Sequence, residues 1–226
     1  MINVYFIPGI CVNCHIFDLI QLPEGYQKNY IEWYVPSGNE SLEEYARNMA
    51  KSIDTSKPFI LIGYSLGAVI MQEMNKFLCP EQNIVLSSMK ATEEIPLLFR
   101  WVKKSHIVSI IPQVFFTLNK TSTNFLTRIV FDMTPQDVDD YVSCTKAVYM
   151  KWAISQITNW QPTTQCKNLY HIHGTRDQIF FSKRIKNAEI IEGADHLMVV
   201  RRAEEVNRIL SKCLQTSKEV LPLPSN

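Results

Sequence analysis

The sequence predicts an α/β fold in which a mostly parallel sheet of about six strands is flanked by helices. Short apolar runs bounded by turn residues alternate with helical patterns, which is typical of βα units. Most of these runs lack a polar alternation, as expected for parallel strands that helices cover on both faces. The length of 226 residues fits one fold unit with its own core.

The expected strands follow one another along the chain with helical patterns between them, at residues 3–7, 30–35, 59–64, 83–87, 168–173 and 188–192. Ser41-Leu42-Glu43-Glu44 is a capping box, so a helix begins there and runs to about Ile53. A second helix begins at Leu66, has apolar residues at spacings of three and four, and is stopped by Pro80. A last helix begins near Leu197.

One long segment interrupts this rhythm, because far more residues than a usual crossover separate the fourth expected strand from the fifth. The segment is rich in helical patterns and large aromatic residues. We therefore expect an α/β core formed by residues 1–88 and 166–226, and a helical cap or lid formed by residues 89–165. Each aromatic residue there either packs against the core or lines an apolar substrate pocket under the cap.

Composition argues against several classes of partner. The chain has 23 Lys and Arg against 22 Asp and Glu, a net charge of +1, and no sustained basic run, so we expect no nucleic-acid partner. No apolar run reaches the roughly 18 residues of a membrane span, and the N-terminus lacks an export signal. We expect a cytoplasmic protein.

The six cysteines are spread widely, and we interpret them as reduced thiols. Cys11-x-x-Cys14 has the spacing of a redox pair or of half a zinc site. A zinc site needs a second pair at ligand spacing, and His171-x-His173 is a poor match on a strand. Two loop thiols and no metal site are the simpler interpretation.

The strongest chemical signal is the pentapeptide Gly63-Tyr64-Ser65-Leu66-Gly67. It joins a buried strand to an amphipathic helix, so Ser65 stands on a sharp strand-to-helix turn. Gly63 and Gly67 are the small residues that let the strand and the helix approach each other there. A serine hydroxyl needs an exposed position, a base and oxyanion donors to act as a nucleophile, and this turn supplies the position.

A base and an acid follow in the chain order that this elbow requires, nucleophile first, then acid, then histidine. Asp177 and His196 each follow an expected strand, at the sheet edge where sites in parallel sheets form. Asp195 is interpreted as a helix-capping or solvated residue, and the strand end at residues 86–89 offers no carboxylate. The remaining rivals are strand, cap or unplaced residues: His15, His106, His171, His173, Asp137, Asp139 and Asp140.

The expected oxyanion donors are two backbone N–H groups. Leu66 follows the nucleophile and supplies one. Pro8-Gly9-Ile10 follows the first strand, and Gly9 is expected to let the backbone turn so that the Ile10 N–H points at the substrate. A plain βα turn is the alternative interpretation of this segment.

These segments, in this order, resemble the α/β-hydrolase superfamily: Pro8-Gly9, the Ser65 pentapeptide, His173-Gly174-Thr175-Arg176-Asp177 and Gly193-Ala194-Asp195-His196. The resemblance covers most of the chain outside the cap. Members usually carry His-Gly where this chain has Pro8-Gly9, and they commonly begin with a hairpin. The chain is thus similar to a small bacterial-type member with a sheet shortened at the N-terminus.

The resemblance implies a mechanism that needs no cofactor. Ser65 would attack an acyl carbon, His196 would accept and return the proton, and Asp177 would orient the imidazole. The expected activity is that of a carboxylesterase or thioesterase acting on a small to medium, largely apolar acyl substrate. An acyltransferase, a C–C bond hydrolase, a lyase or a ligand-binding protein with little turnover remains open, because fold does not decide function.

Overall fold

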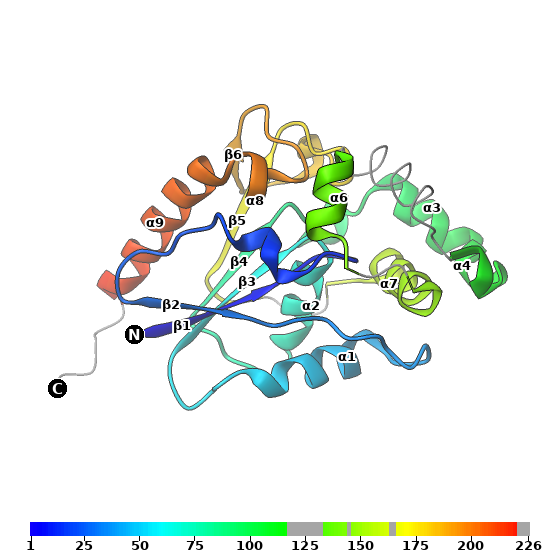
Figure 1. Ribbon diagram of the computed structural model, residues 1–226, viewed down its shortest axis with the longest axis horizontal. Coiled ribbons are helices and arrows are strands. Elements are labelled where there is room, and N and C mark those ends of the chain that lie inside the picture. The colour runs from blue at the N-terminus through cyan, green and yellow to red at the C-terminus, as the bar shows by residue number, and fades with distance from the viewer. Residues whose placement is uncertain (117–132, 144–145, 163–165, 221–226) are drawn as a thin grey trace.

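A computed structural model describes residues 1–116, 133–143, 146–162 and 166–220. Its centre is a six-stranded sheet with the order β2-β1-β3-β4-β5-β6, in which every pair of neighbours is parallel (Figure 1). The strands are β1 (Ile2–Ile7), β2 (Tyr26–Tyr30), β3 (Phe59–Tyr64), β4 (Gln82–Leu86), β5 (Leu169–Gly174) and β6 (Glu189–Ile191). This sheet confirms the predicted α/β fold.

Helices cover both faces of the sheet. The α-helices described outside the β4–β5 connection are α1 (Leu42–Met49), α2 (Leu66–Met74), α8 (Met198–Arg201) and α9 (Ala203–Val220). Short 3₁₀ helices are η1 (Cys14–Phe17), η2 (Ala50–Ser52) and η5 (Ser182–Arg184). Figure 1 shows α1 and α2 on one side of the sheet and η1, α8 and α9 on the other.

Alternate residues of the strands supply two apolar cores, one on each face. Tyr5 and Ile7 pack under α1 and α2, whereas Val4 and Phe6 pack under η1, α8 and α9. All four side chains are buried, which is why the strands are apolar without a polar alternation.

The predicted helix starts are confirmed. The Ser41 hydroxyl accepts the Glu44 N–H, and the Glu44 carboxylate accepts the Ser41 N–H, so the capping box of α1 is complete. Helix α2 begins at Leu66 as predicted but ends at Met74, well before Pro80. Asn75 is its C-cap, and the chain continues as a turn in which the N–H groups of Phe77 and Leu78 donate to Met74 O.

The second strand was predicted wrongly. It is Tyr26–Tyr30, not the apolar run 30–35, because β2 is an edge strand whose register with β1 ends at Tyr30. The apolar run lies beyond the sheet and packs on helices instead. Tyr34 stacks on Tyr45 of α1 with ring centroids 4.4 Å apart, and this contact explains why the run is apolar.

Helices form most of the chain that the structure describes between β4 and β5. Its elements are η3 (Thr92–Glu94), α3 (Leu97–Ser105), α4 (Ile107–Ile110), η4 (Gln113–Phe116), α6 (Pro135–Tyr141) and α7 (Ala147–Asn159). They gather beyond the carboxyl ends of the strands, at the right of Figure 1. The proposed cap, residues 89–165, also includes residues 117–132, 144–145 and 163–165, which lie outside the described part of the chain.

Helix α7 joins this segment to the core. Tyr149 and Trp152 of α7 are buried in the same apolar core as α1 and α2. The Trp152 indole N–H donates to Glu40 O, and the Trp160 indole N–H donates to Glu73 Oε1 of α2. The inner helix of the segment is therefore fixed, and α3, α4 and η4 lie on it.

The start of α2 touches the end of β1 with no room for a side chain. A Cβ on Gly67 would lie 2.1 Å from Ile7 O and 2.4 Å from Pro8 O. A Cβ on Gly63 would lie 2.4 Å from the Cα of Ala68. Both glycines therefore have the close-approach role that the sequence predicts.

Replacing Gly67 by alanine should destabilise the protein, because the new methyl group meets backbone that cannot move away cheaply. We expect Gly67→Ala to lower the free energy of unfolding by about 2–3 kcal/mol, measured by urea denaturation. Lys57→Ala, at an exposed position, is the control and should change it by less than about 0.5 kcal/mol. An unchanged unfolding midpoint for Gly67→Ala would contradict this packing.

Candidate active site

Ser65 stands between β3 and α2 with φ 53° and ψ −122°. A positive φ is uncommon outside glycine, and holding a residue there costs about 1–3 kcal/mol. The strand beside it holds this turn in place: the Ser65 N–H donates to Leu86 O at 3.0 Å, and the Ser88 hydroxyl donates to Ser65 O at 2.8 Å. Ser65 therefore lies on the strand-to-helix elbow that the sequence predicts.

The structure brings Ser65, His196 and Asp177 together in one chain of hydrogen bonds. His196 follows β6, and its Nε2 lies 3.1 Å from Ser65 Oγ. Its Nδ1 lies 2.9 Å from Asp177 Oδ2, on the loop after β5. A carboxylate can only accept, so His196 Nδ1 carries the proton and Nε2 is the acceptor for the Ser65 hydroxyl. All three residues are buried.

Backbone groups fix the Asp177 carboxylate for this contact. Oδ1 accepts the N–H groups of Ile179 and Phe180, each at 2.9 Å, so Oδ2 is left to face His196. Burial works to raise the pKa of Asp177, but the charge and hydrogen bond of His196, with smaller contributions from His173 and the Phe180 N–H, hold that pKa below its ordinary value of 3.8. Asp177 is therefore ionised at neutral pH.

The two loops that carry Asp177 and His196 meet at a glycine. A Cβ on Gly174 would lie 2.2 Å from Ala194 O, so only glycine lets the end of β5 approach the loop after β6 this closely. The Arg176 N–H donates to the same Ala194 carbonyl at 2.8 Å. Gly174 stands in a segment that the sequence singles out, but its role in joining the loops needed the structure.

The segments that carry the candidate oxyanion donors lie near Ser65. A Cβ on Gly9 would lie 3.0 Å from Ser65 Cβ, which places the loop after β1 against the elbow. In the described residues the Ile10 N–H donates to no acceptor, and the Leu66 N–H is at the first position of α2, where a helix provides none. The positive φ of this loop is at Cys11 rather than Gly9, so Gly9 is needed for space and not for the turn.

The rival acids have other partners. Asp195 Oδ1 accepts the Leu197 N–H at 2.9 Å, and its carboxylate also pairs with Arg201 of α8. Leu197, and not Asp195, is the N-cap residue of α8. Asp137 pairs with the same Arg201 at 2.9 Å and caps α6 through Thr134. Neither carboxylate is the partner of His196 Nδ1 in the described structure.

The rival histidines lie elsewhere or support the site. His15 is exposed and pairs with Asp18, and His106 ends α3 in the left-handed conformation. His173 is closer: its Nε2 donates to Phe180 O at 2.7 Å and lies 3.8 Å from Asp177 Oδ2. It therefore holds the loop that presents Asp177. The signal that could have identified it is its place four residues before Asp177.

Two aromatic residues that the sequence did not single out pack beside His196. The Tyr64 hydroxyl donates to His196 O at 3.1 Å, and the Tyr64 ring centroid lies 5.3 Å from that of His196. The Phe180 ring centroid lies 5.9 Å from it on another side, and Phe99 of α3 packs edge-on against Phe180. Tyr64 is part of the serine pentapeptide, but no sequence pattern indicates which aromatic rings will pack beside His196.

Both thiols of Cys11-x-x-Cys14 are buried inside the protein. Cys11 Sγ donates to Met150 Sδ of α7 at 2.8 Å. Burial and the neighbouring Glu32 raise the pKa of the Cys14 thiol, which disfavours the thiolate needed for redox or metal chemistry. In the part of the chain that the structure describes, no three His, Cys, Asp or Glu side chains gather as metal ligands would.

A buried polar cluster lies beside the site. Lys90 Nζ donates to His171 Nδ1 at 2.9 Å and pairs with Glu94 Oε1 at 3.1 Å. Burial first, and then Lys90 and His173, hold the pKa of His171 well below its ordinary value of 6.5. Burial also lowers the pKa of His173. Both histidines are therefore neutral in the folded protein near pH 7.

Comparison with known proteins identifies the fold. No protein-family model matches the chain, and no curated protein sequence matches it. Solved structures do match. One is a putative non-heme bromoperoxidase, BpoC, from Mycobacterium tuberculosis H37Rv, with a TM-score of 0.68 and 16% identity over 96% of this chain and 93% of that chain.

Two further similar structures are a thermophilic esterase and a putative lipase. The esterase, from Thermogutta terrifontis, has a TM-score of 0.64 and 13% identity over 96% of this chain and 90% of its own. The lipase, from Acinetobacter baumannii AYE, has a TM-score of 0.69 and 13% identity over 97% of this chain and 85% of its own. The chain has the α/β-hydrolase fold, as its sequence resemblance implied.

The buried histidines predict a loss of stability in acid. Because their pKa values are depressed in the folded state, the unfolded chain gains protons below about pH 6.5 that the folded chain does not bind. The contribution of the two neutral histidines to the free energy of unfolding is fully present above this pH and is lost as the pH falls. For His171, whose pKa lies well below 6.5, the loss approaches about 1.4 kcal/mol per pH unit. His171→Gln keeps an acceptor for Lys90 but does not titrate, so urea denaturation between about pH 6.5 and 5 should show a shallower loss.

Lys57→Gln, at an exposed position away from the histidines, is the control and should keep the pH dependence of the wild type. The interpretation is wrong if His171→Gln loses stability with the wild-type slope across the same pH range.

Proposed function

We propose that the protein is a serine hydrolase that cleaves an ester or thioester of a small to medium, largely apolar acyl group. The observation that carries this proposal is the buried hydrogen-bond chain from Ser65 through His196 to Asp177. A hydroxyl, an imidazole with a fixed tautomer and an ionised carboxylate are the parts that nucleophilic acyl transfer requires. They come from three loops at one edge of the sheet.

The reaction proceeds in two halves through an acyl-enzyme. In the first, His196 Nε2 takes the Ser65 proton as Oγ bonds to the acyl carbon, and the carbonyl oxygen becomes an oxyanion that the Ile10 and Leu66 N–H groups bind. The protonated His196 then gives its proton to the leaving alcohol or thiol as the bond to the acyl carbon breaks. Asp177 stays ionised throughout and stabilises the imidazolium.

Water completes the second half. His196 accepts a proton from a water molecule, the resulting hydroxide bonds to the acyl carbon, and the oxyanion again lies on the two N–H groups. The collapse of this intermediate releases the carboxylic acid, and His196 returns the proton to Ser65 Oγ. The chain thus needs only its own residues and water, without a cofactor.

The apolar surroundings of the base support the proposed substrate class. Phe180 is fully buried beside His196, and Phe99 of α3 packs against it. These rings make the immediate surroundings of His196 apolar, which suits an apolar acyl chain better than a charged group. The printed names of two compared structures, an esterase and a putative lipase, agree with this class.

The direct test is labelling and turnover. A fluorophosphonate probe should label the wild-type protein, and p-nitrophenyl esters of increasing acyl length should be hydrolysed. Ser65→Ala should abolish labelling and lower kcat/KM by on the order of 10⁴ to 10⁶. His196→Ala and Asp177→Asn should each lower it by on the order of 10³ or more, because each removes the proton acceptor or its correct tautomer.

Ser87→Ala is the matched control, since Ser87 is another buried serine at the end of the neighbouring strand β4. It should keep labelling and turnover. A ligand-binding protein would instead show no labelling and no Ser65-dependent product with any ester or thioester, and that result would reject the proposal.

A further inference from the structure

The outer surface of the β4–β5 segment carries large apolar side chains that the protein leaves in solvent. Of the large apolar residues that are most exposed in the described part of the chain, half come from residues 97–116. They are between 58% and 74% exposed and comprise Leu97, Leu98, Trp101, Ile110, Val114 and Phe115. We call this surface, together with Arg100 and Lys104, the α3–η4 face. A soluble surface rarely gathers so many large apolar side chains without a binding role.

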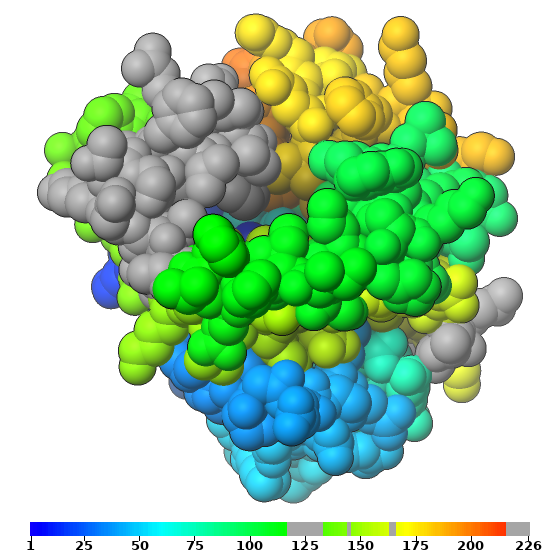
Figure 2. Space-filling view, turned by 90° about the vertical axis from the view of Figure 1, so that its right-hand side faces the viewer, coloured from blue at the N-terminus to red at the C-terminus, as the bar shows by residue number. Residues whose placement is uncertain are grey.

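These side chains point to one side of the molecule. Helices α3 and α4 and the 3₁₀ helix η4 all pack on α7, so their exposed side chains point away from α7. In Figure 2 the same elements, in green, form one band across the face turned to the viewer. Phe181 is also 56% exposed, and it follows the buried Phe180, on which Phe99 of α3 packs.

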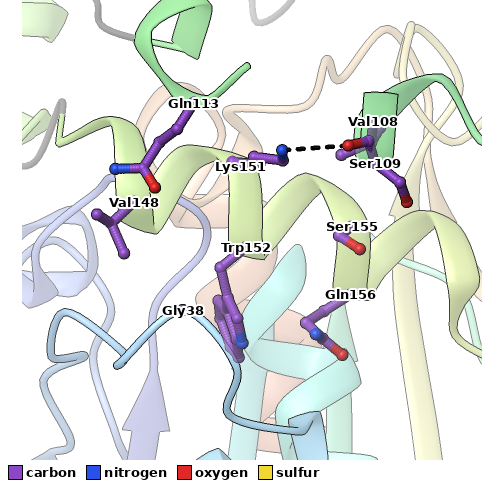
Figure 3. Close-up of a pocket in the computed structure, with 9 residues that line it drawn as sticks. All are labelled: Gly38, Val108, Ser109, Gln113, Val148, Lys151, Trp152, Ser155 and Gln156. Carbon is purple, nitrogen blue, oxygen red and sulfur yellow. Dashed lines mark hydrogen bonds between the residues drawn. The ribbon is translucent and has the colours of Figure 1, made fainter. Parts of the chain in front are cut away.

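Hydrogen bonds from α7 hold the α3–η4 face in place. Lys151 of α7 donates to Ile111 O at 2.8 Å and to Ser109 O, as Figure 3 shows for the second bond. The cavity left between these elements holds about 120 Å³, which is below the size of an ordinary small-molecule pocket. The elements that carry the exposed apolar side chains are therefore fixed to α7. The cavity between these elements and α7 is too small to take the exposed side chains in.

Helix α3 has the residue pattern of a helix that lies on a lipid surface. By helical periodicity, Leu97, Trp101 and Leu98 stand side by side on its outer side, with Arg100 and Lys104 along one flank. The opposite side of α3 presents Phe99 to Phe180 of the core. Apolar side chains thus point outward although the helix already has an inward apolar contact.

The positive charge of this segment favours an anionic partner. From Ile95 to Phe116 the sequence contains Arg100, Lys103 and Lys104 and no Asp or Glu, although the whole chain has a net charge of only +1. Positively charged side chains beside exposed apolar ones are complementary to a surface that is anionic outside and apolar inside. A second copy of the chain fits less well, because a two-fold contact would place these cations against their own copies.

We propose that the α3–η4 face docks on the surface of an anionic phospholipid bilayer. Leu97, Leu98 and Trp101 enter the boundary between headgroups and acyl chains, and Lys104 binds lipid phosphates. Arg100, which donates to the carbonyl oxygens of Thr92 and Glu93, adds its positive charge beside them. The contact is peripheral, since no helix in the described residues is long and apolar enough to cross a membrane. It is independent of the reaction at Ser65.

Vesicle flotation tests the docking. The wild type should float with phosphatidylcholine vesicles containing about one third phosphatidylserine, stay behind with pure phosphatidylcholine, and lose binding as salt is raised. Leu97→Ser/Leu98→Ser should weaken binding on the order of tenfold or more, and Lys104→Glu on the order of tenfold. Leu19→Ser and Lys57→Glu make the same changes at other exposed positions and should bind as the wild type does.

Tryptophan fluorescence locates the contact. Trp101 is the exposed member of four tryptophans, so vesicles with brominated acyl chains should quench wild-type emission but not that of Trp101→Phe, which still floats. Ser65→Ala should float and be quenched like the wild type, so a failed hydrolase proposal leaves this test intact.

Three results would overturn the docking proposal. One is the absence of flotation with anionic vesicles. Another is quenching that persists in Trp101→Phe, which would place the contact on a different face. The third is a dimer in sedimentation that Leu97→Ser/Leu98→Ser dissociates, because the face would then belong to a second copy.

Discussion

The contact between the start of α2 and the end of β1 is the constraint on which the site depends. Gly67 lies against the carbonyl oxygens of Ile7 and Pro8, and this approach brings the loop after β1 onto the elbow. Ser65 stands beside this contact in a strained conformation, held by hydrogen bonds to Leu86 and from Ser88. A wider separation of α2 and β1 would move the loop that carries Ile10 away from Ser65. Packing at Gly67 and Gly9 therefore holds the proposed oxyanion loop against the elbow.

The remaining parts of the site follow from the parallel sheet. Because every strand ends at the same edge, the loops after β5 and β6 reach the elbow, and Gly174 lets them touch. Asp177 is held by two backbone N–H groups and His196 by Tyr64 and Phe180, so neither has to be ordered by substrate. Phe99 connects this interior to α3, whose other side forms the exposed α3–η4 face. One helix thus lies between the proposed catalytic base and the proposed lipid surface.

Much of this arrangement could be predicted from the sequence, because its signals are local. The capping box at Ser41, the start of α2 at Leu66 and the placement of Ser65, Asp177 and His196 at strand ends all depend on short patterns. The second strand could not be predicted, since an edge strand is polar and the apolar run after it is buried by helices instead. The roles of Gly174, His173 and Phe180 depend on contacts between loops that periodicity does not encode. The α3–η4 face could not be predicted either, because an apolar helical pattern does not indicate which side of the helix remains exposed to solvent.

The most direct test of the central claim is a crystal structure of the protein after reaction with a fluorophosphonate. We expect phosphorus bonded to Ser65 Oγ, one phosphoryl oxygen about 2.7–3.1 Å from the N–H groups of both Ile10 and Leu66, and His196 still hydrogen-bonded to Asp177. A phosphonate on another residue, or a phosphoryl oxygen that contacts neither N–H group, would contradict it.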